Sequence, residues 1–283
     1  MHPALRETAR SLSRHKRQWF AAEPRTPLQW YAAAQGWSEP LAALLAARLP
    51  QLPAATKQIW IATAFHALLL RDRVQVVGGS RLGLSEAALT AVADRLNPLL
   101  HEDGIELLPC GQLLLACADR LWRVDPLPFA AIEGKSLPNR HQPGVDGGKW
   151  ARLHAEIQML LGQSAIETAQ PGMAINGLWL WGGAEFSAVQ SRQWTPAVTS
   201  DAELLSLLPA AWPRQPERRL AILDADSVAE YLARYPKPLR GLLLGAGYGL
   251  DLTPGSLFSL PKRNWQPPAT LATAADLDAR LVR

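Results

Sequence analysis

The sequence contains only two cysteines among 283 residues, and they do not form a Cys-x-x-Cys pair. Zinc sites and redox-active dithiols use that spacing, so the sequence predicts neither. No serine-nucleophile signature is present either. We expect Cys110 and Cys117 to be packed free thiols in a reducing, cytoplasmic compartment. A disulfide between them stays open, since the two residues can lie on paired strands.

Long apolar runs are also absent. No segment approaches the ~20 uninterrupted apolar residues of a membrane-spanning helix, and the N-terminal arm lacks the apolar centre of a signal peptide. Residues 1–25 hold six basic and two acidic residues, which account for the net charge of +4. Such an arm can touch nucleic acid or anionic lipid, but Leu5, Ala9, Leu12 and Trp19 or Phe20 recur at helical spacing. We therefore predict a docked helix with outward charges, no nucleic-acid partner and no membrane span.

Hydrophobic periodicity and the positions of proline and glycine predict an α/β (α+β) fold. We expect four parts: a helical N-terminal region (1–56), a small antiparallel β-β-α-β-β domain (57–125), a segment of loop, helix and strand (126–183), and a C-terminal α/β region (184–283). The β-β-α-β-β domain is predicted from a hairpin of residues 59–70 and 74–77, a helix over 85–100, and a second hairpin of residues 105–108 and 112–118. A helix over residues 150–161 precedes the next strand. The sequence predicts no oligomeric state.

The run Asn176-Gly-Leu-Trp-Leu-Trp-Gly-Gly183 is the most conspicuous part of the chain. Two tryptophans two residues apart lie on one face of a strand, and the two glycines allow a sharp turn. This pattern suits a pocket floor, or equally a packed domain junction in which both indoles are core. The candidate ligand-binding residues are Asn176, Trp179, Trp181, Gly182, Gly183, Glu156, Gln158, Arg140 and His141.

Other candidate sites have simpler explanations. The glycine-rich stretch 245–249 is followed by extended sequence, so it predicts a hairpin turn and not a phosphate-binding loop. Asp224 and Asp226 suit the N-terminus of a helix. His154 and Glu156 are two residues apart, so on a helix they point in different directions and do not form a metal pair. We predict no catalytic residue, no metal ligand and no cofactor.

Two segments carry a family resemblance. The run Glu156–Leu161 and the later run Ile175–Gly183 resemble a group of uncharacterised bacterial proteins identified as regulatory protein RpfE type, or as phosphoglycerate mutase-related. The resemblance covers about residues 57–185. The same region is similar to the inserted domain of archaeal-type, cofactor-independent phosphoglycerate mutases, which combines a β-β-α-β-β unit, a loop, a helix and an Asn-x-x-Trp-x-Trp-Gly run.

The resemblance implies the fold of that insert and no catalytic residue. The mutases belong to the alkaline-phosphatase superfamily, whose two-metal site needs Asp and His ligands and a Ser nucleophile. The chain has no histidine after Gly183. We therefore expect a non-catalytic binding or regulatory protein related to these mutases, with a phosphorylated small molecule or a protein as its partner. The alternative is a metal-dependent enzyme acting on a phosphorylated metabolite through Asp224, Asp226 and His141.

Overall fold

The computed structural model divides into two compact units. It describes residues 16–21, 23–71, 73–138, 142–163, 166–209, 221–223, 227, 231, 241–245 and 248–253. The first unit comprises Met1–Trp37, Trp194–Asp201 and Leu208–Arg283, and the second comprises Ser38–Gln193 and Ala202–Leu207. Both units contain helices and antiparallel strands, which confirms the mixed α/β (α+β) fold. The division into four sequence segments stays a prediction.

The first unit contains a three-stranded antiparallel sheet. Its strands are β1 (Lys16–Ala21), β11 (Gly241–Gly245) and β12 (Tyr248–Thr253), in the order β1-β12-β11. The antiparallel pairing of β11 with β12 confirms the hairpin predicted around residues 245–249. A short parallel pair, β9 (Val198–Thr199) and β10 (Ala221–Ile222), belongs to the same unit.

Strand β1 corrects the helix predicted through Trp19 and Phe20. These residues pair with Leu250 and Gly249 of β12, and the Phe20 side chain is fully buried. Helical spacing is a local pattern, whereas these residues pair with a strand more than 200 positions later in the sequence. Local propensity does not report such a tertiary pairing. Residues 1–15, including Leu5, Ala9 and Leu12, lie outside the described residues.

Helix α2 (Pro27–Ala34) begins with a capping box. The Thr26 hydroxyl accepts from the Gln29 amide, and the Gln29 side chain accepts from the Thr26 amide, with Pro27 at the first helical position. Its Tyr31 stacks on Trp194, with the ring centroids 5.4 Å apart. The Tyr31 hydroxyl also donates to the Thr195 carbonyl at 2.8 Å. These contacts join distant stretches of the first unit.

The second unit is built on a five-stranded antiparallel sheet. Its strands are β2 (Gln58–Leu69), β3 (Val74–Gly78), β4 (Ile105–Cys110), β5 (Leu113–Ala118) and β8 (Gly177–Glu185). Strand β2 is central, because it pairs with β3, β5 and β8. This arrangement confirms the β-β-α-β-β order and adds the Trp-Leu-Trp strand as a fifth member.

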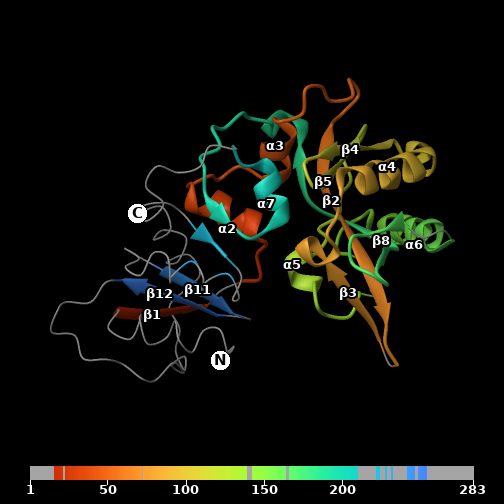
Figure 1. Cartoon of the computed structure of the whole chain (residues 1–283). Coiled ribbons are helices and arrows are strands. Elements are labelled where there is room, and N and C mark those ends of the chain that lie inside the picture. The colour runs from red at the N-terminus through yellow and green to blue at the C-terminus, as the bar shows by residue number, and fades with distance from the viewer. Residues whose placement is uncertain are drawn as a thin grey trace. The chain divides into compact units, whose positions relative to one another are not determined.

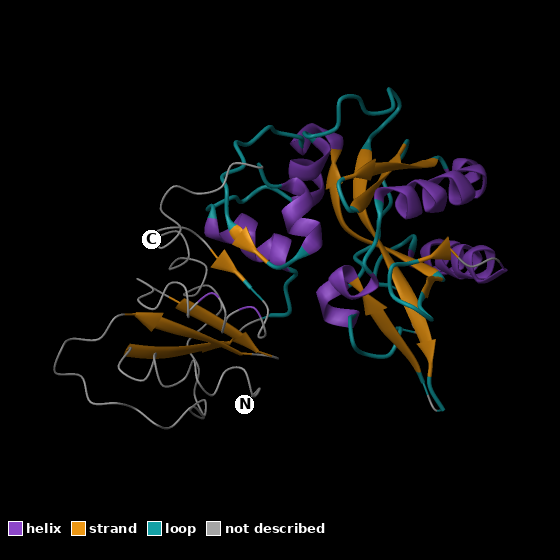
Figure 2. Cartoon of the chain, viewed as in Figure 1, coloured by secondary structure: helices purple, strands orange, loops and turns teal. Residues whose placement is uncertain are grey.

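Helices cover both faces of this sheet (Figures 1 and 2). Helices α4 (Glu86–Leu100) and α6 (Gly147–Gln163) lie on one face, and α3 (Leu41–Ala46) and α5 (Phe129–Ile132) on the other. The main core lies between the sheet and α4 and α6, and it includes Trp60, Ala62 and Ala64 of β2. The remaining short elements are α7 (Ala202–Leu207), β6 (Ile166–Glu167), β7 (Ala174–Ile175) and the 3-10 helices at Gly79–Leu82, His101–Asp103 and Phe186–Ala188.

The two cysteines are buried free thiols, as predicted. They lie on the paired strands β4 and β5, but Cys117 is opposite Glu106 and Cys110 is opposite Leu113. Burial raises the pKa of Cys110 to about 11 and that of Cys117 to about 12. Both thiols therefore stay protonated at neutral pH, as packing residues do. No helix in the described part of the chain is both long and apolar enough to cross a membrane.

Candidate ligand-binding site

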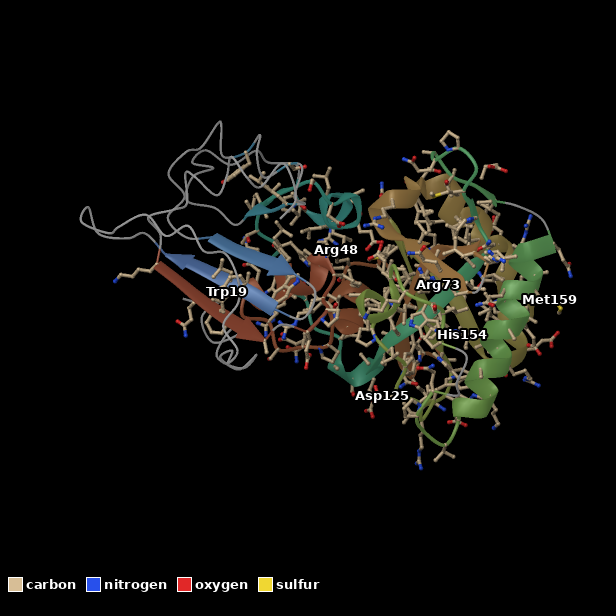
Figure 3. The ribbon with its side chains drawn as sticks, turned by 90° about the horizontal axis from the view of Figure 1, so that it is seen from below. Trp19, Arg48, Arg73, Asp125, His154 and Met159 are labelled. Atoms are coloured by element: carbon tan, nitrogen blue, oxygen red, sulfur yellow. The ribbon has the colours of Figure 1, made fainter. Side chains whose placement is uncertain are left out.

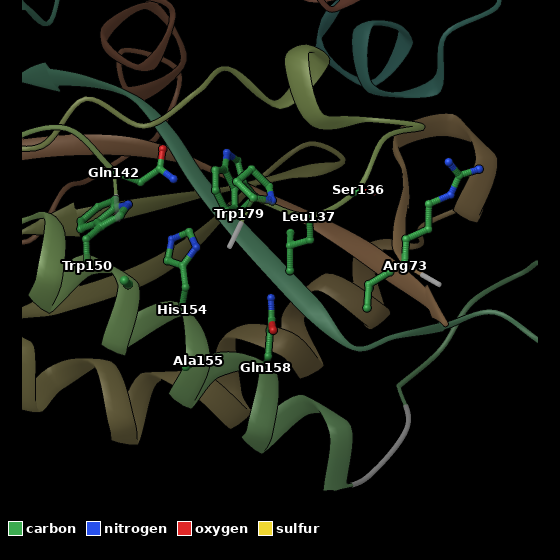
Figure 4. Close-up of a pocket in the computed structure, with 12 residues that line it drawn as sticks. Arg73, Ser136, Leu137, Gln142, Trp150, His154, Ala155, Gln158 and Trp179 are labelled. Atoms are coloured by element: carbon green, nitrogen blue, oxygen red, sulfur yellow. The ribbon is translucent and has the colours of Figure 1, made fainter. Parts of the chain in front are cut away.

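A cavity of about 540 Å³ lies beside β8 in the second unit (Figure 4). This volume falls within the range of about 300–1,000 Å³ that is usual for small-molecule sites. Helix α6 forms one wall with Trp150, Ala151, His154, Ala155 and Gln158. The spacing of four residues between Trp150, His154 and Gln158 places them in one stripe on the helix. The small side chains of Ala151 and Ala155 leave space next to that stripe.

The ring of His154 lies between the indoles of Trp150 and Trp179. Its centroid is 5.7 Å from that of Trp150 and 4.7 Å from that of Trp179, which it meets edge to face. The side chain is on the inner side of α6, opposite Met159 on the outer side (Figure 3). His154 is 7% exposed and Met159 is 64% exposed.

Burial sets the protonation state of His154. Desolvation lowers its pKa from 6.5 to about 4, so the imidazole is neutral at neutral pH. Its Nε2 is buried and has no hydrogen-bond partner among the described residues. A neutral imidazole nitrogen either donates or accepts, depending on the tautomer. His154, which lines the cavity, thus carries an unused hydrogen-bonding atom without a charge.

The indole of Trp150 also has a buried nitrogen that lacks a hydrogen-bond partner among the described residues. Its Nε1, like those of Trp60 and Trp122, is buried without a partner in the described part of the chain. The Trp150 ring lies 4.7 Å from Trp60 and 5.2 Å from Trp122, centroid to centroid. Buried polar atoms are normally hydrogen-bonded, so a group of orphaned donors next to a cavity requires an explanation.

The opposite wall of the cavity is held on strand β3. Leu137 donates its amide to the Val74 carbonyl at 3.0 Å, and Ser136 forms a bridge with Gln75. Val74, Ser136, Leu137, Pro138 and Arg73 all border the cavity from this side. Arg73 lies at one end of the cavity and Trp150 at the other (Figure 4).

Two hydrogen bonds to Leu127 secure the adjoining loop. Its carbonyl accepts from Trp179 Nε1 at 2.8 Å, and its amide donates to Gln142 Oε1 at 3.3 Å. Trp179 and Gln142 both line the cavity. The cavity is therefore bounded by side chains whose positions the backbone fixes.

Two of the predicted site residues, Trp179 and Gln158, line this cavity. Glu156 does not line it, and its carboxylate is 3.7 Å from the guanidinium of Arg152 on the outer part of α6. Arg140 and His141 lie outside the described residues.

Asn176 and Trp181 serve the sheet. Asn176 Oδ1 accepts from the Ala67 amide at 2.5 Å, and its Nδ2 donates to the Ala67 carbonyl at 3.2 Å. Asn176 thereby continues the β2–β8 ladder with a side chain. Trp181 Nε1 donates to the Thr63 hydroxyl at 2.9 Å inside the core. Each polar atom of the two side chains therefore has a partner within the sheet.

Gly182 and Gly183 form a β-bulge. The register between β2 and β8 shifts between Ile59 and Ile61, so Trp60 lies opposite both glycines. Gly182 has a φ of 63°, which favours glycine. A Cβ on Gly183 would lie 2.5 Å from the Trp60 ring. Gly183 therefore makes room for a core indole, and Gly182 supplies the left-handed backbone conformation of the bulge.

His154, Trp150 and Arg73 are not among the residues that the sequence predicts for the site. The sequence relates His154 only to Glu156, at a spacing that is wrong for a metal pair. The signal that identifies it is the stripe of Trp150, His154 and Gln158 flanked by two alanines. No local sequence pattern marks Arg73 as a site residue, because the β2–β3 hairpin is what brings it to the cavity.

The residues of the predicted enzyme alternative, Asp224, Asp226 and His141, lie outside the described residues. Within the described ranges, no group of three or more His, Cys, Asp or Glu residues could hold a metal ion.

Comparison with known proteins yields little. No family model matches the sequence, and no curated protein matches it. One solved structure that is similar is the cofactor-independent phosphoglycerate mutase from Thermoplasma acidophilum DSM 1728. It has 9% identity and a TM-score of 0.36, over 96% of this chain and 89% of that chain. At this level the link to the mutases is weak, and no finding supports the RpfE-type resemblance.

Proposed function

We propose that this chain is a non-catalytic binding protein whose ligand, a small molecule, occupies the cavity beside β8. The observation that carries the proposal is the buried, unpartnered Nε2 of His154, a residue that lines the cavity. Leaving a buried polar atom unpaired costs about 1–3 kcal/mol, so a bound ligand that supplies the partner would recover that free energy.

The geometry around the cavity supports this proposal. Its walls come from α6, β8 and the segment paired with β3, and its size suits a small molecule. Aromatic side chains with a few polar groups are the usual lining of ligand sites. A regulatory role of this chain would follow if ligand binding in the cavity changed its stability or its affinity for a partner. A relation of the chain to the phosphoglycerate mutases is also part of the proposal.

A fragment screen by ligand-observed NMR tests the proposal. Ala155→Trp places an indole at the cavity wall, and Met159→Trp adds the same indole to the outer side of the same helix. We expect fragments that bind the wild type and Met159→Trp but not Ala155→Trp. If every bound fragment is insensitive to Ala155→Trp while that variant remains folded, the cavity is not the binding site.

The enzyme alternative has its own test. A ligand that binds only the native state raises the melting temperature. A shift that requires both 3-phosphoglycerate and Mg²⁺ or Mn²⁺ would support a metal-dependent enzyme acting on a phosphorylated metabolite. A shift with a small molecule alone, lost in Ala155→Trp, would support the non-catalytic binding protein.

A further inference from the structure

We propose that the cavity beside β8 takes an aromatic acid, with its ring on the floor formed by Trp150, His154 and Trp179 and its acid group at Arg73. This inference rests on the proposed function and specifies the ligand of the same site. It follows from the distribution of aromatic surface, hydrogen-bonding groups and charge around the cavity.

The floor selects a flat, apolar body. Trp150, His154 and Trp179 present aromatic rings, and all three side chains are at least nine-tenths buried. Aromatic rings pair with other rings in stacked or edge-to-face geometry, as His154 and Trp179 already do. Another ring is the occupant that extends this arrangement with the most contact per atom.

The unpaired nitrogens of the lining residues also favour a ligand whose ring system carries a polar atom. The indole Nε1 of Trp150 is a donor only, whereas His154 Nε2 donates or accepts. Both atoms lack a partner among the described residues. An oxygen or nitrogen acceptor on the ligand's ring would satisfy one of them once binding shifts the side chains that cover both atoms in the free protein. Since burial keeps His154 neutral, this contact does not require a ligand charge.

The charge of the ligand follows from the other end of the cavity. Arg73 is the single charged side chain among the described lining residues, and none of these residues is acidic. Arg73 is exposed and takes part in no ion pair with another described residue. A guanidinium binds carboxylate and phosphate oxygens through two parallel hydrogen bonds. An anionic group on the ligand therefore belongs at this end.

The volume limits the ligand to a modest size. About 540 Å³ accommodates a bicyclic ring with an acid substituent. Inorganic phosphate alone would reach Arg73 without filling the aromatic floor. A neutral ring would fill the floor without engaging Arg73. Only a molecule that combines the two features uses the whole cavity.

Isothermal titration calorimetry with four probes tests the inference. The probes are 2-naphthoate, its neutral counterpart 2-naphthamide, cyclohexanecarboxylate and inorganic phosphate. We expect 2-naphthoate to bind most tightly. Arg73→Gln should weaken 2-naphthoate by about tenfold and leave 2-naphthamide unchanged. Arg71→Gln is the matched control, because Arg71 is exposed in the same hairpin turn and does not line the cavity.

Salt dependence provides a second readout. Raising the salt concentration from about 0.05 M to about 0.5 M screens an exposed charge. We therefore expect weaker binding of 2-naphthoate and unchanged binding of 2-naphthamide. Equal loss for both probes would contradict a role for Arg73 in recognising the acid group.

The outcomes separate this inference from the proposed function. If 2-naphthamide binds as well as 2-naphthoate and Arg73→Gln has no effect, the ligand class is wrong. The proposed function then stands as long as Ala155→Trp abolishes 2-naphthamide binding. If no probe and no fragment in the screen is sensitive to Ala155→Trp, both the ligand class and the binding site are wrong. Tight binding of inorganic phosphate or cyclohexanecarboxylate alone would overturn the aromatic part.

Discussion

Strand β8 with the preceding Asn176, and helix α6, each combine tryptophan and amide side chains, but the fold uses their polar groups differently. In β8 and the residue before it, Asn176 bonds to Ala67 and Trp181 bonds to Thr63. In α6, the polar atoms of Trp150 and His154 that lie in the interior have no partner among the described residues. In the conspicuous run, Asn176 and Trp181 thus serve packing, whereas the candidate site lies where hydrogen-bonding capacity remains unused.

The largest expected effect on stability comes from a substitution that disrupts the packing of β8. Gly183→Val would place a branched side chain where a single Cβ already lies 2.5 Å from the Trp60 ring. We expect the free energy of unfolding to fall by about 3 kcal/mol, measured by urea denaturation. Gly148→Ala in α6 is the control, because a Cβ there meets nothing within 4 Å. A loss below about 1 kcal/mol for Gly183→Val would contradict the bulge as a packing device.

The second prediction concerns the pH dependence of stability through His154. Its pKa is 6.5 in the unfolded chain and about 4 in the folded protein. Above pH 6.5 the two states bind the same number of protons at this residue. Between pH 6.5 and about 4 only the unfolded chain takes up the proton. The free energy of unfolding therefore decreases as the pH is lowered through this range.

The contribution of His154 to this decrease is about 2–3 kcal/mol. It is measured as the difference between the wild type and His154→Phe in urea denaturation across that pH range. His101→Phe, at an exposed histidine, is the matched control. Parallel pH profiles for the wild type and His154→Phe would show that this histidine is not buried in its neutral form.

The third prediction separates a structural amide from a binding amide. Asn176→Ala leaves the amide and the carbonyl of Ala67 unpaired, so we expect a stability loss of about 2 kcal/mol. Gln158→Ala should change stability by less than about 0.5 kcal/mol, because the side chain is partly exposed on α6. Calorimetry with 2-naphthoate should show the reverse order of effects on affinity. Equal effects of both variants on binding would remove the distinction.

The smallest expected effect compares the two indoles of β8. Trp179→Phe and Trp181→Phe each remove one hydrogen bond, to the Leu127 carbonyl and to the Thr63 hydroxyl. We expect each to cost about 1 kcal/mol of stability in thermal denaturation. Only Trp179→Phe should change the affinity for 2-naphthoate, because only Trp179 lines the cavity. A change caused by Trp181→Phe would indicate that the binding site extends into the core.

Local patterns predicted much of the second unit. The β2–β3 and β4–β5 hairpins and helix α4 followed from periodicity and from turn and capping residues, because their contacts are close in sequence. The pairing of β8 with β2 did not follow, since no local signal specifies a partner more than 100 residues away. The strand at Trp19 was missed for the same reason.

The candidate site was predictable only in part. The aromatic character of Trp179 and the polar character of Gln158 were visible in the sequence. Whether a hydrogen-bonding group is already used depends on three-dimensional neighbours, as the contrast between Asn176 and His154 shows. The sequence also did not reveal that residues 135–137 pair with β3 and bring residues 136–138 to the cavity.

The pairing of β2 has a consequence for the order of folding. Its hairpin with β3 closes across a turn of four residues, whereas its pairing with β8 joins Thr63 to Trp179. Local pairs form quickly, and a distant strand is added only after a large loss of chain entropy. We expect β8 to dock late, after the two hairpins and α4. A compound that binds beside β8 would therefore recognise only chains that have completed folding, and would serve as a reporter of that last step.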